Sequence, residues 1–295
     1  AGTCRTGADC PSGICAAGIC QSDQTSTTGA TGDQGGAGAG EGGSASEGGG
    51  SADGGSSSEG GGGPLCESEN DGEIRRDEVP LEAGYRASFL TSTSSDFDTQ
   101  GDTEEGERTW DFDVDFDGDH LVLSETLDPS EQWFGSVFPD ATYAARLSDT
   151  SDLLGVFQAT DDALLLLGVA SQEDGFTRTE LTYTPPVTIL EFPLEEGNEW
   201  STTTTVSGLA EGVGVVYYEV YDDEVDARGT AKTPYSDFDV LRVRVDLTRT
   251  VGVLVTTTRT FAFVTECFGT VARAVSQDND TSPEFDDPAE VHDRD

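Results

Sequence analysis

Residues 213–225 read VGVVYYEVYDDEV, and this stretch carries the pattern that decides the fold. β-branched and aromatic residues dominate it, as they dominate the next two stretches, DFDVLRVRVDLTRT at 237–250 and VGVLVTTTRTFAFV at 251–264. Residues of these types are enriched in β-strands, whereas Gly, Pro and Asp mark the turns between strands. Because the intervals between the runs are short, we expect neighbouring strands to pair antiparallel.

Runs of the same kind recur across residues 65–277, and Asp161-Asp162 separates two of them, 153–160 and 163–171, at hairpin distance. Helical periodicity is weak, and the one candidate helix lies near 139–149. The sequence therefore predicts an all-β fold. It would be an antiparallel meander of about ten to twelve strands that forms a barrel, a half-barrel or a sandwich.

Composition divides the chain into four regions. Residues 1–21 are a Cys-rich, disulfide-bonded module that is too small for a hydrophobic core. Residues 22–64 form an acidic Gly/Ser-rich linker without a basic or aromatic residue, and such a segment cannot bury enough apolar surface to offset its ordering entropy. The antiparallel β domain spans 65–277, and residues 278–295 form an acidic tail that we expect to be disordered.

The six cysteines point to disulfides, because the chain has only two histidines to complete zinc sites. We expect Cys66 and Cys267 to pair and to join the two ends of the β domain. The other four pair among themselves, in one of three arrangements that the sequence leaves open: Cys4, Cys10, Cys15 and Cys20.

The net charge of −43, from 15 basic and 58 acidic residues, excludes nucleic acid and anionic lipid as partners. Methionine is absent, so we expect a secretory signal to have been removed before Ala1. The longest apolar run, 163–170, is too short to span a membrane. These features predict a secreted or cell-surface bacterial protein without a transmembrane segment, from a saline habitat.

Residues 110–120, WDFDVDFDGDH, raise the question of calcium. The first half matches an EF-hand loop that starts at Asp113, but the twelfth position is Ser124 instead of glutamate. Apolar residues alternate with the aspartates from Trp110 to Phe116, which favours a half-buried strand. We expect Asp117-Gly118 to turn a hairpin whose second strand begins at His120.

A weaker alternative keeps calcium at this hairpin as a structural or charge-neutralising ion. Carboxylates at alternate positions of one strand lie about 6.5–7 Å apart, too far for all of them to bind one ion, but the turn could bring two together. Calcium is the only cofactor that the sequence suggests. The candidate ligands are Asp113, Asp115, Asp117 and Asp119.

The sequence predicts a protein that is not an enzyme, with no catalytic residue assigned. His120 lies at the expected hairpin end and His292 lies in the expected tail, and neither belongs to a known catalytic motif. A Ser-His-Asp site that uses His120 is a weaker alternative. No Walker loop and no Rossmann glycine pattern occur, and among 58 acidic residues a pair of carboxylates carries no information.

Two pairs of adjacent aromatic residues are candidate binding groups, Trp133 with Phe134 and Tyr217 with Tyr218. In a strand, one residue of each pair faces away from the core, where its ring could stack on a sugar or anchor a protein partner. The alternative is that both faces of the sheet are covered.

Two resemblances add to this interpretation. ADCPSGICAAGIC, residues 8–20, is similar to Cys-rich motifs near the N-termini of secreted myxobacterial proteins. FPLEEGNEW at 192–200, VDARGTAKTP at 225–234 and FDVLRVRV at 238–245 resemble uncharacterised secreted or lipoprotein-like bacterial β proteins. That resemblance implies export and an open half-barrel, and it implies no active site. The chain departs from the pattern at Tyr235-Ser236-Asp237, where a glycine is usual.

Together these features predict an exported, non-enzymatic protein that binds a protein or glycan at the cell envelope. An alternative is a structural subunit that self-associates into an extracellular filament or coat. A secreted hydrolase that uses carboxylates is a more distant third.

Overall fold

The structure is a computed structural model that describes residues 66, 68–93, 96–104, 106–280 and 282–295, together with the backbone of two short N-terminal strands. It divides into two units, residues 1–65 and 66–295. In the first unit, β1 (Cys15–Ala16) pairs antiparallel with β2 (Ile19–Cys20). The pairing of the four N-terminal cysteines lies outside the described side chains.

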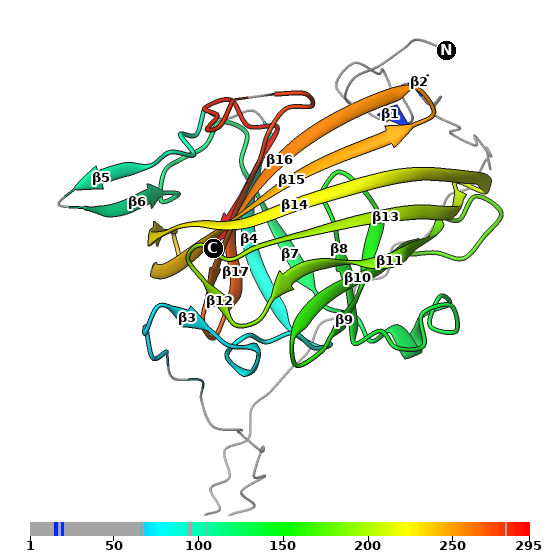
Figure 1. Cartoon of the computed structure of the whole chain (residues 1–295), viewed down its shortest axis with the longest axis horizontal. Coiled ribbons are helices and arrows are strands. Elements are labelled where there is room, and N and C mark those ends of the chain that lie inside the picture. The colour runs from blue at the N-terminus through cyan, green and yellow to red at the C-terminus, as the bar shows by residue number, and fades with distance from the viewer. Residues whose placement is uncertain are drawn as a thin grey trace, which may run out of the picture. The chain divides into compact units, whose positions relative to one another are not determined.

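The second unit is built from one fourteen-stranded sheet (Figure 1). Its long central strands coincide with the runs that the sequence singles out. These runs are rich in β-branched and aromatic residues, which favour strands. The strands on the main path, in spatial order, are β7 (His120–Glu125), β4 (Arg86–Ser92), β18 (Glu290–Arg294), β17 (Gly269–Val275), β16 (Leu254–Thr265), β15 (Asp237–Val251), β14 (Val213–Lys232), β13 (Glu199–Ala210), β11 (Glu180–Glu191), β10 (Ala163–Ser171), β9 (Leu153–Ala159) and β8 (Tyr143–Arg146).

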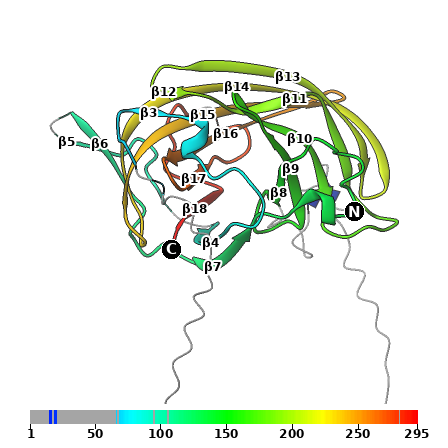
Figure 2. The same ribbon diagram turned by 90° about the horizontal axis from the view of Figure 1, so that it is seen from below.

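The two edge strands of this path, β7 and β8, come together and nearly close the sheet into a barrel (Figure 2). Just beyond β7, the amide of Leu127 donates to the carbonyl of Ala144 at 2.8 Å, and Ala144 donates back at 3.0 Å. Every pairing on the path is antiparallel, as in the hairpins β9–β10 and β15–β16. The predicted all-β antiparallel fold is confirmed.

Two additions decorate the barrel. β6 (Glu107–Asp111) pairs with β5 (Asp102–Glu104) and runs parallel to β14, the one parallel pairing among the described strands. A separate two-stranded sheet joins β3 (Glu73–Ile74) to β12 (Leu194–Glu195). Short 3-10 turns occupy Arg76–Glu78 and Pro129–Glu131.

The barrel interior is filled at one end by the segment that contains β3. Ile74, Val79 and Leu81 pack there with apolar side chains of the long strands, such as Leu241 and Val243. Burial of these side chains from water stabilises the closed sheet. The predicted disulfide between Cys66 and Cys267 is confirmed, and it ties the start of this segment to the β16–β17 turn.

A second core lies on the outer face of the sheet, between β14–β17 and the segments that cross them. Trp110, Phe112 and Phe261 are fully buried in it. Residues 97–99 run beside residues 285–286, since the amides of Phe97 and Thr99 donate to carbonyls of that segment at 3.1 Å. The C-terminal region is therefore part of the folded unit.

This arrangement overturns two expectations. The tail at 278–295 was expected to be disordered, but it contains β18, which pairs with both β17 and β4. Val291 is fully buried, and this anchors a strand that is otherwise polar. The candidate helix near 139–149 is wrong as well, because β8 occupies its centre.

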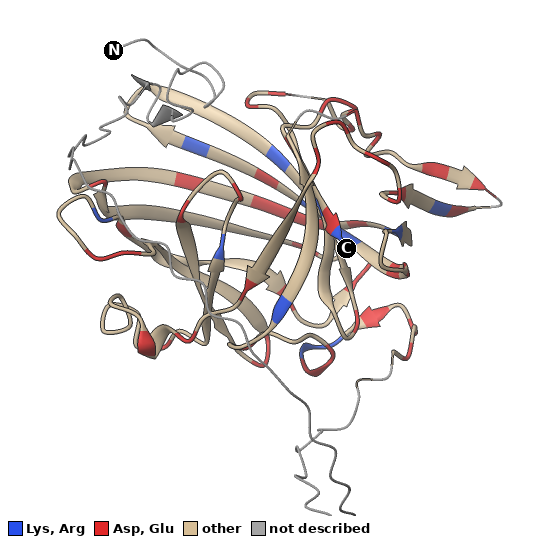
Figure 3. Cartoon of the chain, turned by 180° about the vertical axis from the view of Figure 1, so that it is seen from behind, with Lys and Arg blue, Asp and Glu red and all other residues tan. Residues whose placement is uncertain are grey.

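Acidic residues are spread over the strands and loops, and Lys and Arg occupy few places (Figure 3). Most described arginines therefore form ion pairs. Arg242 is 1% exposed, donates to Asp226 and to Glu284 at 2.9 Å, and lies 5.3 Å from the Trp110 ring centroid. Among the described residues, the arginines that form no ion pair are Arg76, Arg108, Arg228 and Arg294.

Candidate functional site

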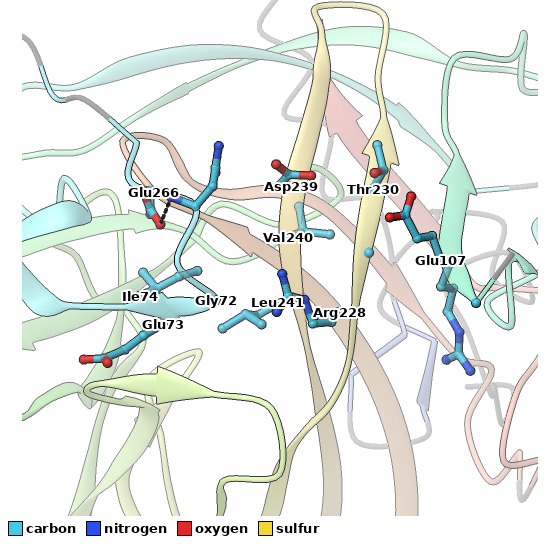
Figure 4. A pocket seen from close by; sticks show the side chains of 14 residues that line it. Gly72, Glu73, Ile74, Glu107, Arg228, Thr230, Asp239, Val240, Leu241 and Glu266 are labelled. Atoms are coloured by element: carbon cyan, nitrogen blue, oxygen red, sulfur yellow. Dashed lines mark hydrogen bonds between the residues drawn. The ribbon is translucent and has the colours of Figure 1, made fainter. Parts of the chain in front are cut away.

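A pocket of about 280 Å³ opens where β3, β6, β14 and β15 meet (Figure 4). β14 and β15 form its floor, and Figure 4 shows Asp239, Thr230 and Glu107 approaching one another from three different strands. The full lining is Asn70, Gly72, Glu73, Ile74, Gly106, Glu107, Arg108, Arg228, Gly229, Thr230, Asp239, Val240, Leu241 and Glu266.

Local backbone geometry explains how these strands approach so closely. A Cβ atom on Gly229 would lie 2.2 Å from the Arg108 carbonyl oxygen, so only glycine lets β6 pack beside β14. Gly72 has a φ of +91°, and a Cβ there would lie 2.7 Å from Nη1 of Arg228. Gly229 therefore admits β6 beside β14, and Gly72 leaves room for the Arg228 side chain at the pocket wall.

Arg228 forms no hydrogen bond or ion pair with any of the described residues, although four carboxylates line the same pocket. Two of these carboxylates are already engaged. Glu266 accepts the amide of Glu69 at 2.5 Å and that of Asn70 at 3.1 Å, and Glu73 pairs with Arg75 at 3.1 Å. The carboxylates of Glu107 and Asp239 remain available.

This combination suits a small ligand that carries both charge and hydrogen-bond donors. A guanidinium presents a planar fork of N–H donors that matches carboxylate or phosphate oxygens. Carboxylates accept from hydroxyl or ammonium groups. A volume of about 280 Å³ lies at the small end of ligand pockets.

The acidic stretch at 110–120 is not a hairpin. β6 ends at Asp111, and the strand that begins at His120 pairs with β4 instead. The alternation of burial is nevertheless confirmed at Trp110, Phe112 and Phe116, whereas Val114 is 44% exposed. The amide of Phe112 donates to the Lys232 carbonyl at 2.8 Å, so the chain stays hydrogen-bonded to the end of β14 just after β6. Residues 110–112 therefore pair with β14 and not with the strand that begins at His120.

The predicted calcium ligands do not converge on one point. Asp113, Asp115 and Asp117 are exposed and Asp119 is partly exposed. Within the described part of the chain, no three His, Cys, Asp or Glu side chains are arranged to hold a metal ion. Calcium binding by this stretch stays a prediction.

The two histidines lie in one row across the sheet, on either side of β4, which the sequence does not reveal. Thr91 on β4 pairs with His120 on one side and His292 on the other. His120 contacts Asp149 through Nε2 at 2.7 Å, and this hydrogen bond raises its pKa. His292 contacts the Thr91 hydroxyl at 2.8 Å, and burial followed by the nearby Arg273 charge lowers its pKa to about 3.

His292 is therefore neutral near pH 7 and enclosed by Thr91 and by the Phe89 ring, whose centroid is 4.1 Å away. Thr91 is 1% exposed, whereas His292 is half-buried. A hydroxyl this deeply buried with a histidine partner fits a structural contact. The only sequence signal for it is the alternating pattern of EVHDR at 290–294.

The candidate aromatic residues fall into two groups. Phe134 is fully buried, so its interpretation as a binding group is wrong, and Trp133 donates from Nε1 to the Ser171 carbonyl at 2.9 Å. They follow a 3-10 turn and do not lie in a strand. On β14, Tyr217 is half-buried and Tyr218 is 57% exposed, as expected for neighbours on a strand.

A buried polar cluster on β14 escaped the sequence interpretation. Glu219 is 0% exposed, accepts from the Tyr221 hydroxyl at 2.8 Å and pairs with Nε of Arg249 at 2.6 Å. Burial also raises the pKa of Tyr183 and Tyr221. Both oxygens of Glu219 are thereby satisfied, which fits a structural ion pair.

Comparison of the chain with protein-family models, with curated proteins and with solved structures finds no match in any of the three. Among the described residues, no helix has the length and apolar character needed to cross a membrane. The geometry of the pocket is therefore the main guide to function.

Proposed function

We propose that this chain is an exported, non-enzymatic binding protein whose pocket at Arg228 takes a small carboxylate ligand with hydroxyl or ammonium donors. Acidic sugars and peptide ends share this chemistry, and both occur at a bacterial envelope. The supporting observation is the guanidinium of Arg228, which has no acidic partner among the described residues of a chain with 58 acids.

The carboxylates of Glu107 and Asp239 indicate which groups the ligand carries besides its own carboxylate. Glu107 and Asp239 lie on different strands of the same pocket and accept hydrogen bonds only. A simple anion would be repelled by them, whereas a ligand with its own donors would satisfy them. Because Arg228 is exposed, solvent screens its charge, and we expect a Kd on the order of 0.1–1 mM.

Calorimetric titration tests this proposal with three probes: glucuronate, glycylglycine and uncharged glucose. We expect wild-type protein to bind one of the two carboxylates and to ignore glucose. Arg228→Gln should weaken binding by about tenfold or more, because it removes a charge-assisted pair of hydrogen bonds. Arg228→Lys should restore part of the affinity.

Arg86→Gln is the matched control, since it removes the same charge from an exposed arginine that pairs with Glu125 at 2.6 Å, away from the pocket. If both variants lost the same affinity, the loss would come from the change in net charge alone, and the proposal would be contradicted. Absence of binding by either carboxylate would contradict it as well.

Self-association is a second candidate function, supported by apolar side chains at the hairpin ends. Phe176 is 97% exposed and Val253 is 95% exposed. Sedimentation velocity in high salt, where the charge repulsion is screened, should show species larger than a monomer if these ends are interfaces. The variant Val253→Ser should then reduce them, and a monomer at all concentrations would exclude this function.

A further inference from the structure

The carboxylates of Glu107 and Asp239 reach the pocket from the two strands that flank β14. Asp239 on β15 pairs directly with Thr230 on β14, and Glu107 lies on β6, which runs along the other side of β14. Figure 4 shows these three side chains approaching one another. Because like charges repel, two carboxylates that separate strands bring together favour a cation between them.

The described part of the chain does not supply this cation. Neither Glu107 nor Asp239 forms a side-chain hydrogen bond or an ion pair with another described residue. Both residues are exposed, so a ligand can reach them from solvent. Carboxylates also outnumber guanidiniums among the residues that line the pocket. A ligand that offers only hydroxyl groups would satisfy the acceptors but would leave this negative charge unbalanced.

The strand register sets the distance between the cationic and the acidic side of the pocket. Arg228 lies two residues before Thr230 on β14, and alternate residues of a strand point to the same face about 6.5–7 Å apart. Arg228 pairs with Leu241, so Asp239 is its diagonal neighbour on β15. A ligand that contacts both sides must therefore carry its own anionic and cationic groups several bonds apart.

We infer, resting on the binding function proposed above, that the ligand is a zwitterion whose carboxylate and ammonium groups are separated by several bonds, as at the two ends of a short peptide. Arg228 binds the carboxylate through its planar fork of N–H donors. The ammonium group donates to Glu107 and Asp239, with the Thr230 hydroxyl beside them as a further acceptor. An acidic sugar supplies only the carboxylate half of this pattern.

Calorimetric titration near pH 7 tests the inference with 6-aminohexanoate and hexanoate, which have the same carbon chain and differ in the ammonium group. We expect 6-aminohexanoate to bind about tenfold more tightly, because it adds a charge-assisted hydrogen bond. Adipate, which has a second carboxylate at that end, should bind more weakly than hexanoate. Glycine, whose charged groups lie on adjacent carbon atoms, should bind more weakly than 6-aminohexanoate, since it cannot span the two sides.

Substitutions assign this preference to the two carboxylates. Glu107→Gln and Asp239→Asn should each reduce the preference for 6-aminohexanoate over hexanoate, and the double variant should remove it. Arg228→Gln should weaken the binding of both ligands. Asp237→Asn is the matched control, because it removes an exposed carboxylate of the same strand that does not line the pocket, and it should keep the preference.

The outcomes separate this inference from the function on which it rests. Equal affinity for 6-aminohexanoate and hexanoate would overturn the inference and leave the carboxylate site intact. A preference that persists in the double variant, or glycine binding as tightly as 6-aminohexanoate, would overturn it too. If none of these ligands bound, and glycylglycine and glucuronate did not bind either, the proposed function would fall together with the inference.

Discussion

Asp223 on β14 shows how one buried residue sets the response of the fold to pH. Its side chain is 4% exposed, and its Oδ2 atom has no hydrogen-bond partner. Burial, and then the charges of Asp222 and Asp246, raise its pKa to about 8. The folded chain therefore keeps this carboxyl protonated at pH values where the unfolded chain ionises it.

Stability should fall as pH rises from the unfolded pKa of 3.8 to the folded pKa of about 8, because only the unfolded state releases the proton in that window. Asp223→Asn removes this dependence. We expect the variant to be about 1–3 kcal/mol more stable than wild type near pH 8 and similar near pH 4. Urea unfolding at both pH values measures the difference.

Asp237→Asn provides the comparison for this prediction, since it removes an exposed carboxylate that is not among the charges acting on Asp223. An Asp223→Asn variant with the same pH slope as wild type would show that Asp223 ionises freely in the folded state.

Buried charged residues were the least predictable part of the molecule. Asp223 and Glu219 look like solvated charges in VGVVYYEVYDDEV, because the sequence shows alternation but does not show which face is buried. Asp293 and His292 were assigned to a disordered tail because EVHDR is polar. Their placement depends on pairing with β4, which is distant in sequence and leaves no local signal.

Among the elements, local hairpins were predictable and distant pairings were not. The turn at Asp161-Asp162 joins β9 and β10 as expected, since both strands and their turn lie in one short stretch. β7 was assigned the wrong partner, because the sequence places it directly after the β6 region, yet it pairs with β4. The pocket depends on such a distant pairing, the parallel one between β6 and β14.

Gly229 controls that pairing, so Gly229→Ala tests it. The added Cβ would lie 2.2 Å from the Arg108 carbonyl oxygen and force β6 away from β14. We expect a loss of about 2–4 kcal/mol in the free energy of unfolding, measured in urea, because a tightly packed interface accepts no extra atom.

The same strand offers a matched substitution. A Cβ on Gly214 would meet no atom within 4 Å, so Gly214→Ala should change stability by less than about 1 kcal/mol. Equal changes in the free energy of unfolding for the two substitutions would mean that β6 can shift without strain. The pairing of β6 with β14 would then not depend on Gly229.

At the scale of the whole molecule, the disulfide between Cys66 and Cys267 joins the start of the folded unit to the turn between β16 and β17. It closes a loop with a sequence separation of 201 residues. Such a cross-link lowers the entropy of the unfolded chain, by about 5 kcal/mol in the chain-entropy account. This contribution is large because the closed loop is long, and it offsets part of the self-repulsion that a net charge of −43 imposes on the compact state.

We expect the double variant Cys66→Ser, Cys267→Ser to lose several kcal/mol of stability, on the order of this chain-entropy value. Urea unfolding of the variant beside oxidised wild type measures the loss. An unchanged unfolding midpoint would show that the barrel closes independently of the cross-link.

We propose that the folded unit binds a small carboxylate ligand between β6, β14 and the β3 segment. Amide chemical-shift mapping during titration with glucuronate and with glycylglycine tests this most directly, because it locates the site as well as detecting binding. We predict that the shifts concentrate at the pocket, at residues 72–74, 228–230 and 239–241. Saturable shifts centred elsewhere on the molecule, or none with either probe, would contradict the account.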